Sequence, residues 1–214
     1  MEKAPIKKFA VEARKKLKAD VTFQLERYGI TENGIVEPQT STDKELVFDL
    51  GNGNTQTIKG ERYVNQYRNL AAHVRGFYTT DEPKKELEQF IEEIAYTWFN
   101  RLIAVRFMEV NDYLPSHIRV LSSESGRLEP DLVATPFDAE LPFTPAEEAE
   151  LVQLRQDNKI DEAFRILFVK QCNALNEILP FLFEKTKDYT ELLINLSVID
   201  QDGVVYHLIH DIPE

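Results

Sequence analysis

The feature that most constrains the fold is one long stretch, Lys84–Tyr113, in which apolar side chains keep a helical spacing without interruption. One stripe recurs at steps of three and four residues: Leu87, Ile91, Ile94, Trp98, Leu102 and Val105. A second set widens the stripe until the later half is apolar almost all round: Phe90, Ala95, Phe99, Ile103, Phe107 and Met108. A helix with this pattern is buried. The stretch therefore predicts a mostly α-helical domain built around a buried central helix at about 84–113.

Composition places the chain among globular proteins. It has 214 residues, of which 43% are hydrophobic and 29% charged, which is enough to bury a substantial core. Its apolar runs are far shorter than the ~20 residues that a membrane span needs, and no secretory signal precedes Phe9. The single cysteine, Cys172, excludes an internal disulfide and a cysteine-based zinc site. We expect a cytoplasmic protein with no membrane partner.

Charge is distributed unevenly along the chain. The net charge is −12, but residues 1–76 carry 13 Lys/Arg against 10 Asp/Glu, whereas residues 77–214 carry 12 against 27. Phosphate contacts are therefore expected in the first third. The pattern favours one domain over 1–214, with a subdivision into a basic part (1–80) and an acidic helical part (81–214) that faces solvent or protein.

The first third predicts two helices separated by a hairpin. Ala4–Tyr28 is amphipathic, and Glu61–Phe77 has a second helical stripe. Residues 31–43 are polar and predict a loop, whereas 45–59 alternate around Gly51–Asn54 and predict a β-hairpin. The Gly-Asn-Gly-Asn cluster lacks the spacing of a phosphate-binding loop, so a plain turn is favoured.

The rest of the chain predicts further helices. Pro115 ends the central helix, and residues 116–143 predict short turns and irregular chain. Helices are expected at about 145–156 and 159–184, the second kinked or divided at Pro180, and a short one at 189–196. The tail after Leu196 alternates around Asp202-Gly203 and predicts either a second hairpin or a helix after the turn.

Basic residues on the two early helices are the candidate nucleic-acid contacts. The set comprises Lys7, Lys8, Arg14, Lys15 and Lys18 on the first helix and Arg68 and Arg75 on the second. Arg68 and Arg75 are seven residues apart and share a helix face, so they could contact a phosphate backbone. The simpler alternative for this pair is a solvated helix face.

No catalytic, cofactor-binding or metal-binding residue is predicted. His207 and His210 form an HxxH pair without the glutamate of a zinc protease, and His73 and His117 stand alone, so surface histidines are favoured. Cys172 lies in a helical apolar pattern and is expected to be a small buried side chain. The chain contains no GxSxG, Walker or GxGxxG motif.

Three charged residues interrupt the apolar zone of the central helix: Arg101, Arg106 and Glu109. Buried charges need partners, and Arg106 and Glu109 are three apart on the helix. We therefore predict structural ion pairs within the core. The alternative is an arginine pair presented to DNA or to a partner domain.

The central stretch also carries a resemblance. Its segments Trp98–Leu102, Arg106–Glu109 and Tyr113-Leu114, together with the opening helix that leads to Tyr28–Ile30, resemble the N-terminal part of the PglX family. These are adenine-specific DNA methyltransferases of the BREX phage-exclusion system, related to large single-chain restriction-modification methyltransferases. The resemblance covers the whole chain, and residues 96–114 are its most specific part.

The resemblance implies a much longer parent enzyme. Such an enzyme binds S-adenosylmethionine and double-stranded DNA and flips adenine out for methylation at N6. The family's catalytic [ND]PP[FYW] motif and its cofactor loop are absent from these 214 residues. The resemblance thus implies an excised N-terminal domain that holds no cofactor, is inactive alone and packs on the methyltransferase domain of its own chain. The alternative is an interaction module that docks other BREX subunits or a phage inhibitor without touching DNA.

Overall fold

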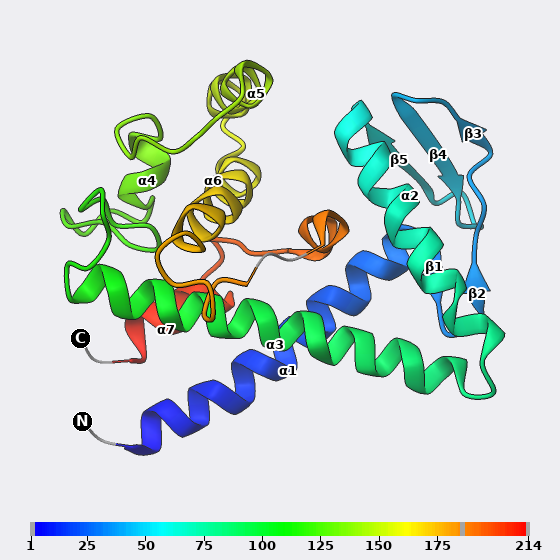
Figure 1. Ribbon diagram of the computed structural model, residues 1–214, viewed down its shortest axis with the longest axis horizontal. Helices are drawn as coiled ribbons and strands as arrows, with labels where there is room; N and C mark the ends of the chain where they lie inside the picture. The colour runs from blue at the N-terminus through cyan, green and yellow to red at the C-terminus, as the bar shows by residue number, and fades with distance from the viewer. Residues whose placement is uncertain (1–2, 185–186, 213–214) are drawn as a thin grey trace. The chain divides into compact units, whose positions relative to one another are not determined.

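The computed structural model describes residues 3–184 and 187–212 and is mostly helical, with two small antiparallel sheets (Figure 1). The predicted fold class is confirmed. Contacts divide the chain into unit 1 (Met1–Lys16, Thr97–Lys185 and Leu196–Glu214) and unit 2 (Leu17–Tyr96 and Thr186–Asn195). Helices α1 (Lys3–Arg27) and α3 (Pro83–Val110) contribute residues to both. The subdivision by charge at residue 80 stays a prediction.

Unit 2 contains all the described strands. β4 (Glu45–Asp49) and β5 (Thr55–Lys59) form the predicted hairpin, and β3 (Thr40–Ser41) extends it to the order β3-β4-β5. β1 (Ile30–Thr31) and β2 (Gly34–Ile35) make a separate pair. The prediction of a plain loop at 31–43 is therefore wrong. These strands are two residues long, too short for alternation to show in the sequence.

The core of unit 2 lies between the three-stranded sheet and α2 (Glu61–Arg75), which crosses the sheet in Figure 1. Phe48 of β4 is fully buried, and its ring packs edge-on against Tyr67 with the ring centroids 4.9 Å apart. Burial and the nearby Glu37 carboxylate raise the pKa of Tyr67 to about 12. The short helices η1 (Phe77–Thr79) and η2 (Asp188–Leu193) complete the unit.

Polar contacts attach η2 to α2. Glu191 accepts a hydrogen bond from Arg62 at 2.7 Å and another from Gln66 at 2.8 Å. Asn69 donates to Asp188 at 3.0 Å. The predicted helix at 189–196 is thus a 3-10 helix that closes one side of α2.

Unit 1 is helical, with the later half of α3, α4 (Asp131–Ala134), α5 (Pro145–Gln156), α6 (Ile160–Leu175) and α7 (Val204–His210) (Figure 1). Its largest fully buried side chains lie on α3, on α6 and in the chain that follows each of them: Trp98, Arg101, Leu102, Leu114, Phe164, Phe168 and Phe183.

The predicted start of α5 is confirmed. Thr144 and Glu147 form a reciprocal capping box, with Pro145 at the first position. Burial alone raises the pKa of Glu147, but hydrogen bonds from Lys170 and Thr144 outweigh it and lower that pKa.

One predicted boundary in unit 1 is wrong. α6 ends at Leu175 rather than 184, because the chain turns back and buries Phe183, whose carbonyl oxygen accepts a hydrogen bond from the Asn176 side chain at 2.8 Å. Pro180 therefore lies beyond the helix. Of the two alternatives for the tail, the helix after the turn is confirmed: α7 follows Gly203, and Val204, Val205 and Leu208 bury one of its faces.

The central helix is confirmed, with a difference on one face. The predicted stripe is buried throughout, but Ile103 is 37% exposed and Phe107 is 60% exposed. The prediction that the later half is buried all round is therefore wrong. Segment 120–122 packs on α3 at Arg106 and Glu109 and leaves Ile103 and Phe107 exposed.

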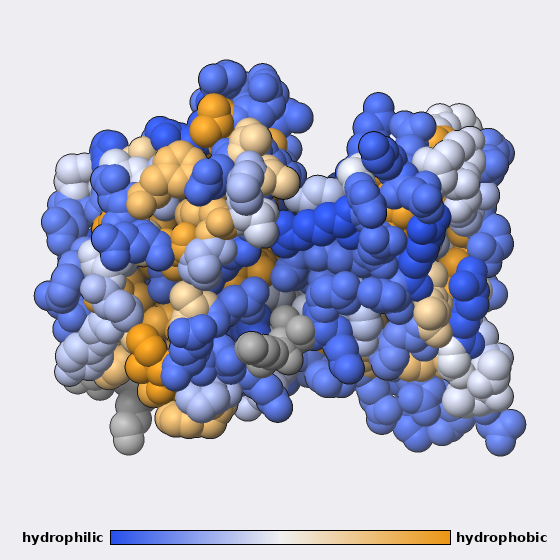
Figure 2. Space-filling view, turned by 45° about the horizontal axis from the view of Figure 1, so that its top comes forward, coloured by the Kyte–Doolittle hydropathy of each residue, from blue (hydrophilic) through white to orange (hydrophobic). Residues whose placement is uncertain are grey.

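Most of the exposed large hydrophobic residues belong to unit 1, and Figure 2 shows apolar side chains reaching its surface at several places. Across residues 3–184 and 187–212, no helix combines the length and the apolar character that crossing a membrane requires.

Candidate nucleic-acid interface

The amphipathic pattern of α1 places four of the predicted basic residues together in unit 1. We call them the α1 basic face: Lys7, Lys8, Arg14 and Lys15. All four are exposed, on the side of the helix away from the buried Phe9 and Ala13. Within the described part of the chain, the ammonium groups of Lys7, Lys8 and Lys15 have no ion-pair or hydrogen-bond partner. This face can therefore offer positive charge to an anion.

The other three predicted contacts lie in unit 2 and are engaged with acidic residues. Lys18 pairs with Glu92. Arg68 pairs with Asp43 at 3.3 Å and also donates to the carbonyl oxygen of Thr42 at 3.0 Å. Arg75 pairs with Glu37 at 2.6 Å. Phosphate binding by these side chains would compete with the pairs, and the seven-residue set stays a prediction.

Arg106 and Glu109 form a buried network at the end of α3. The Arg106 guanidinium lies 2.7 Å from Glu109 Oε1, and the Glu109 side chain is fully buried. Glu109 Oε2 accepts hydrogen bonds from the backbone N–H groups of Val120 and Leu121, each at 2.8 Å. Ser122 Oγ donates to Glu109 Oε1 at 3.0 Å. The carboxylate thus joins α3 to segment 120–122. Its negative charge is balanced by Arg106 and by these hydrogen-bond donors, all within unit 1.

Arg101 is 1% exposed and has a different environment. Its guanidinium lies over the Trp98 ring, 4.7 Å from the ring centroid, and donates to the carbonyl oxygen of Glu184 at 2.5 Å. Cys172 is close by and buried, and burial raises the pKa of its thiol to about 12 against the opposing effect of Arg101. A thiol with that pKa is a poor nucleophile at neutral pH.

The four histidines occupy separate environments. His73 packs among Phe77, Phe90 and Tyr189. His117 Nδ1 lies 2.7 Å from Asp112, and His207 Nδ1 lies 2.9 Å from Asp211. Among the described residues, no group of three or more His, Cys, Asp or Glu side chains is arranged to hold a metal ion.

Sequence reasoning missed one feature of unit 1, a cavity of about 440 Å³ between α6 and the segments that follow α3 and α4. Gln171 of α6 lines it and is 3% exposed. Among the residues that the structure describes, the amide oxygen of this side chain has no hydrogen-bond partner.

Comparison with known proteins defines the class. No family model matches the chain. Over its whole length, however, it is similar to the N-terminal part of adenine-specific methyltransferases. The adenine-specific methyltransferase PglX of Lacticaseibacillus casei (strain Zhang) is 41% identical over 220 residues, which cover 100% of this chain and 18% of the relative. The adenine-specific methyltransferase BrxX of Escherichia coli O9:H4 (strain HS) is 32% identical over 213 residues, covering 98% of this chain and 17% of the relative.

The resemblance predicted from the central helix is therefore confirmed. The chain corresponds to the N-terminal region of PglX and BrxX, and it spans less than a fifth of the length of these curated relatives.

Proposed function

We propose that this chain is the non-catalytic N-terminal domain of a site-specific DNA (adenine-N6) methyltransferase in a cytoplasmic BREX anti-phage system. In this proposal it packs on the catalytic domain of the same chain and contacts double-stranded DNA through the α1 basic face. S-adenosylmethionine binds elsewhere in the parent protein. The observation that carries the proposal is the similarity along the whole chain to the N-terminal region of two adenine-specific methyltransferases.

Two features support a non-catalytic role. The 214 residues contain no [ND]PP[FYW] motif, which adenine methyltransferases use at the flipped base. The residues that carry the family resemblance have structural contacts: Trp98 and Arg101 stack in the core, and Glu109 is saturated by hydrogen bonds. The most specific segment of the chain therefore supports its fold.

The DNA contact is supported by charge and exposure. The protein carries a net charge of −12, which repels a polyanion overall. The lysines of the α1 basic face have no partner among the described residues, so this surface is the exception. Lys7, Lys8 and Lys15 lie on one exposed helix face. Lysines that neutralise DNA phosphates release the counterions bound there, and this release favours binding.

We expect the 214-residue protein to bind a labelled DNA duplex with an affinity that falls as salt rises. The variant Lys7→Gln/Lys8→Gln/Lys15→Gln should bind more weakly at low salt. Its plot of log K against log salt should be shallower by about 2.7, since each phosphate contact contributes about 0.9. Fluorescence anisotropy across a salt series measures both quantities.

A matched variant controls for net charge alone. Lys44, Lys159 and Lys187 are exposed and lie outside α1, so Lys44→Gln/Lys159→Gln/Lys187→Gln makes the same change in charge elsewhere. This control variant should keep most of the slope of log K against log salt. Equal losses in the two triple variants, or no loss in either, would count against the α1 basic face.

The second candidate function is a protein-interaction module that docks other BREX subunits or a phage inhibitor and makes no DNA contact. The cavity beside Gln171 favours it specifically, because Asp138, Glu140 and Glu177 also line that cavity. Partner capture that is insensitive to the three lysine substitutions, together with no DNA binding, would support this alternative.

A further inference from the structure

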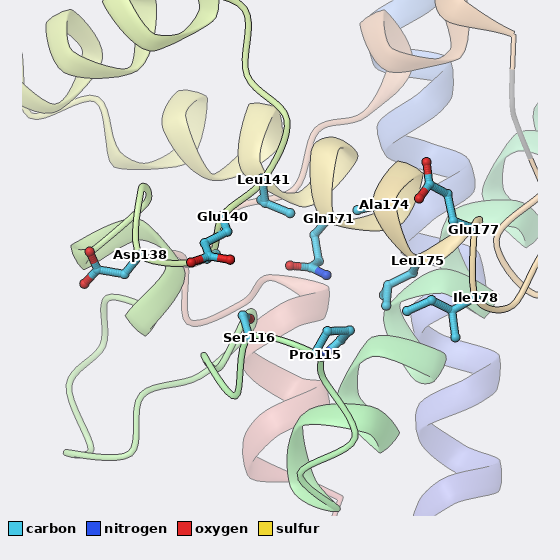
Figure 3. Close-up of a pocket in the computed structure, with 11 residues that line it drawn as sticks. Pro115, Ser116, Asp138, Glu140, Leu141, Gln171, Ala174, Leu175, Glu177 and Ile178 are labelled. Carbon is cyan, nitrogen blue, oxygen red and sulfur yellow. The ribbon is translucent and has the colours of Figure 1, made fainter.

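The cavity of unit 1 is bounded by three segments: the turn after α3, the loop after α4 and the end of α6. In Figure 3 the amide of Gln171 points from α6 into the space between Ser116 and Pro115 on one side and Glu140 on the other. Its volume of about 440 Å³ lies within the ordinary range of ligand pockets.

The side-chain oxygen of Gln171 in this cavity has no hydrogen-bond donor beside it among the described residues. Its side chain is nearly inaccessible, with the residue 3% exposed, yet its Oε1 atom has no hydrogen-bond partner in the described structure. Buried polar atoms are nearly always paired, because an unpaired one costs about 1–3 kcal/mol. A ligand that brings an N–H group to this oxygen would remove that cost.

The charged residues around the cavity favour a positively charged ligand. Every ionisable residue that lines it in the described part of the chain is acidic: Asp138, Glu140 and Glu177. All three are exposed, and in Figure 3 the carboxylates of Asp138 and Glu177 point away from Gln171. Ser116 adds a hydroxyl that can accept a further hydrogen bond.

The remaining walls are apolar, so they favour a cation that also has a hydrocarbon chain to pack against them. Pro115, Leu141, Leu175 and Ile178 line the cavity. The chain beyond α6 then exposes Ile178 (57%), Phe181 (79%) and Leu182 (44%) within five residues. Apolar residues beside the bound cation would cover this edge, so the ligand is expected to be part of a protein segment.

We propose that this cavity binds an arginine side chain carried by a protein segment with apolar flanking residues. Arginine has a hydrocarbon stem for the apolar walls and five N–H donors in a planar fork. One donor reaches Gln171 Oε1, and the rest face the Glu140 carboxylate and the Ser116 hydroxyl. The proposal requires neither DNA binding nor methyl transfer, so it stands or falls separately from the proposed function.

The test is a titration of the 15N-labelled 214-residue protein with acetyl-Leu-Arg-Leu-amide, followed by NMR. We expect shifts centred on residues 115–116, 138–141 and 171–178. A matched peptide with citrulline, the neutral analogue of arginine, should bind at least about tenfold more weakly, because charged hydrogen bonds contribute more than neutral ones. Spermidine should bind more weakly than the arginine peptide because it has no apolar flanks.

Two variants and a control locate the binding. Glu140→Gln removes an exposed charge without disturbing the core and should weaken binding about two- to fivefold. Gln171→Leu removes the unpaired acceptor, should weaken binding about fivefold or more and should not lower the melting temperature. Glu148→Gln, on exposed α5 outside the cavity, should change nothing.

The proposal would be overturned by equal binding of the arginine and citrulline peptides, by shifts away from the cavity, or by binding that is unchanged in both cavity variants. Spermidine binding as tightly as the peptide would also overturn it, because a free cation would then satisfy the site.

Discussion

Replacing Glu109 by glutamine is expected to lower the free energy of unfolding by about 3–5 kcal/mol, the usual range for breaking a buried ion pair from one side. The carboxylate accepts hydrogen bonds from Val120 N, Leu121 N and Ser122 Oγ and pairs with the buried Arg106. Glutamine has the same shape but turns one acceptor oxygen into an NH₂ donor, which then faces other donors. Arg106 also loses its counter-charge.

Thermal and urea unfolding followed by circular dichroism measure this loss. For a protein of this size, 3–5 kcal/mol corresponds to a fall in melting temperature of roughly 6–20 °C. Glu88→Gln is the matched control, because Glu88 is exposed on the same helix and should change stability by less than about 0.5 kcal/mol. Similar stabilities for the two variants would show that the network does not hold α3 to segment 120–122.

Replacing Trp98 by alanine is expected to cost about 3–5 kcal/mol through the cavity it leaves in unit 1. Trp98 is 1% exposed, and its ring packs against Phe168 with centroids 6.2 Å apart. The Arg101 guanidinium lies over the same ring, so the substitution also removes its cation–π contact.

The control for Trp98 lies on the same helix. Phe107 is aromatic and 60% exposed, so Phe107→Ala should leave the free energy of unfolding nearly unchanged. Urea unfolding followed by circular dichroism is the measurement, because Trp98 is the only tryptophan and its fluorescence is lost in the variant. A Phe107→Ala loss as large as that of Trp98→Ala would mean that Phe107 is covered rather than exposed.

Periodicity predicted the helices well because burial of a stripe leaves a strong signal in the sequence. The stripe from Leu87 to Val105 is buried as expected, and the capping box at Thr144 marks the start of α5. Periodicity did not show which other faces are covered. Ile103 and Phe107 are as apolar as the stripe, yet they are exposed, whereas segment 120–122 covers Glu109 on the same helix.

Short elements and helix ends were harder to predict because tertiary contacts determine them. β1, β2 and β3 are two residues each and form through pairing with neighbouring chain. α6 ends at Leu175 because Phe183 returns to the core. A run of apolar residues does not reveal this tertiary contact.

The candidate site was predictable in part. The amphipathic pattern of α1 indicated the exposed lysines, since the buried stripe fixes the opposite face. The acidic partners of Arg68 and Arg75, at Asp43 and Glu37, come from the strand region and could not be inferred from spacing along α2. The unpaired oxygen of Gln171 depends on three segments distant in sequence, so no local pattern records it.

The central claim is that this chain is the non-catalytic N-terminal part of an adenine methyltransferase. Transfer of a labelled methyl group from S-adenosylmethionine to adenine-containing duplex DNA tests it most directly, with the 214-residue protein assayed beside a protein in which the same chain precedes its methyltransferase domain. We expect label in the DNA only with the longer protein. Label transferred by the 214 residues alone would contradict it.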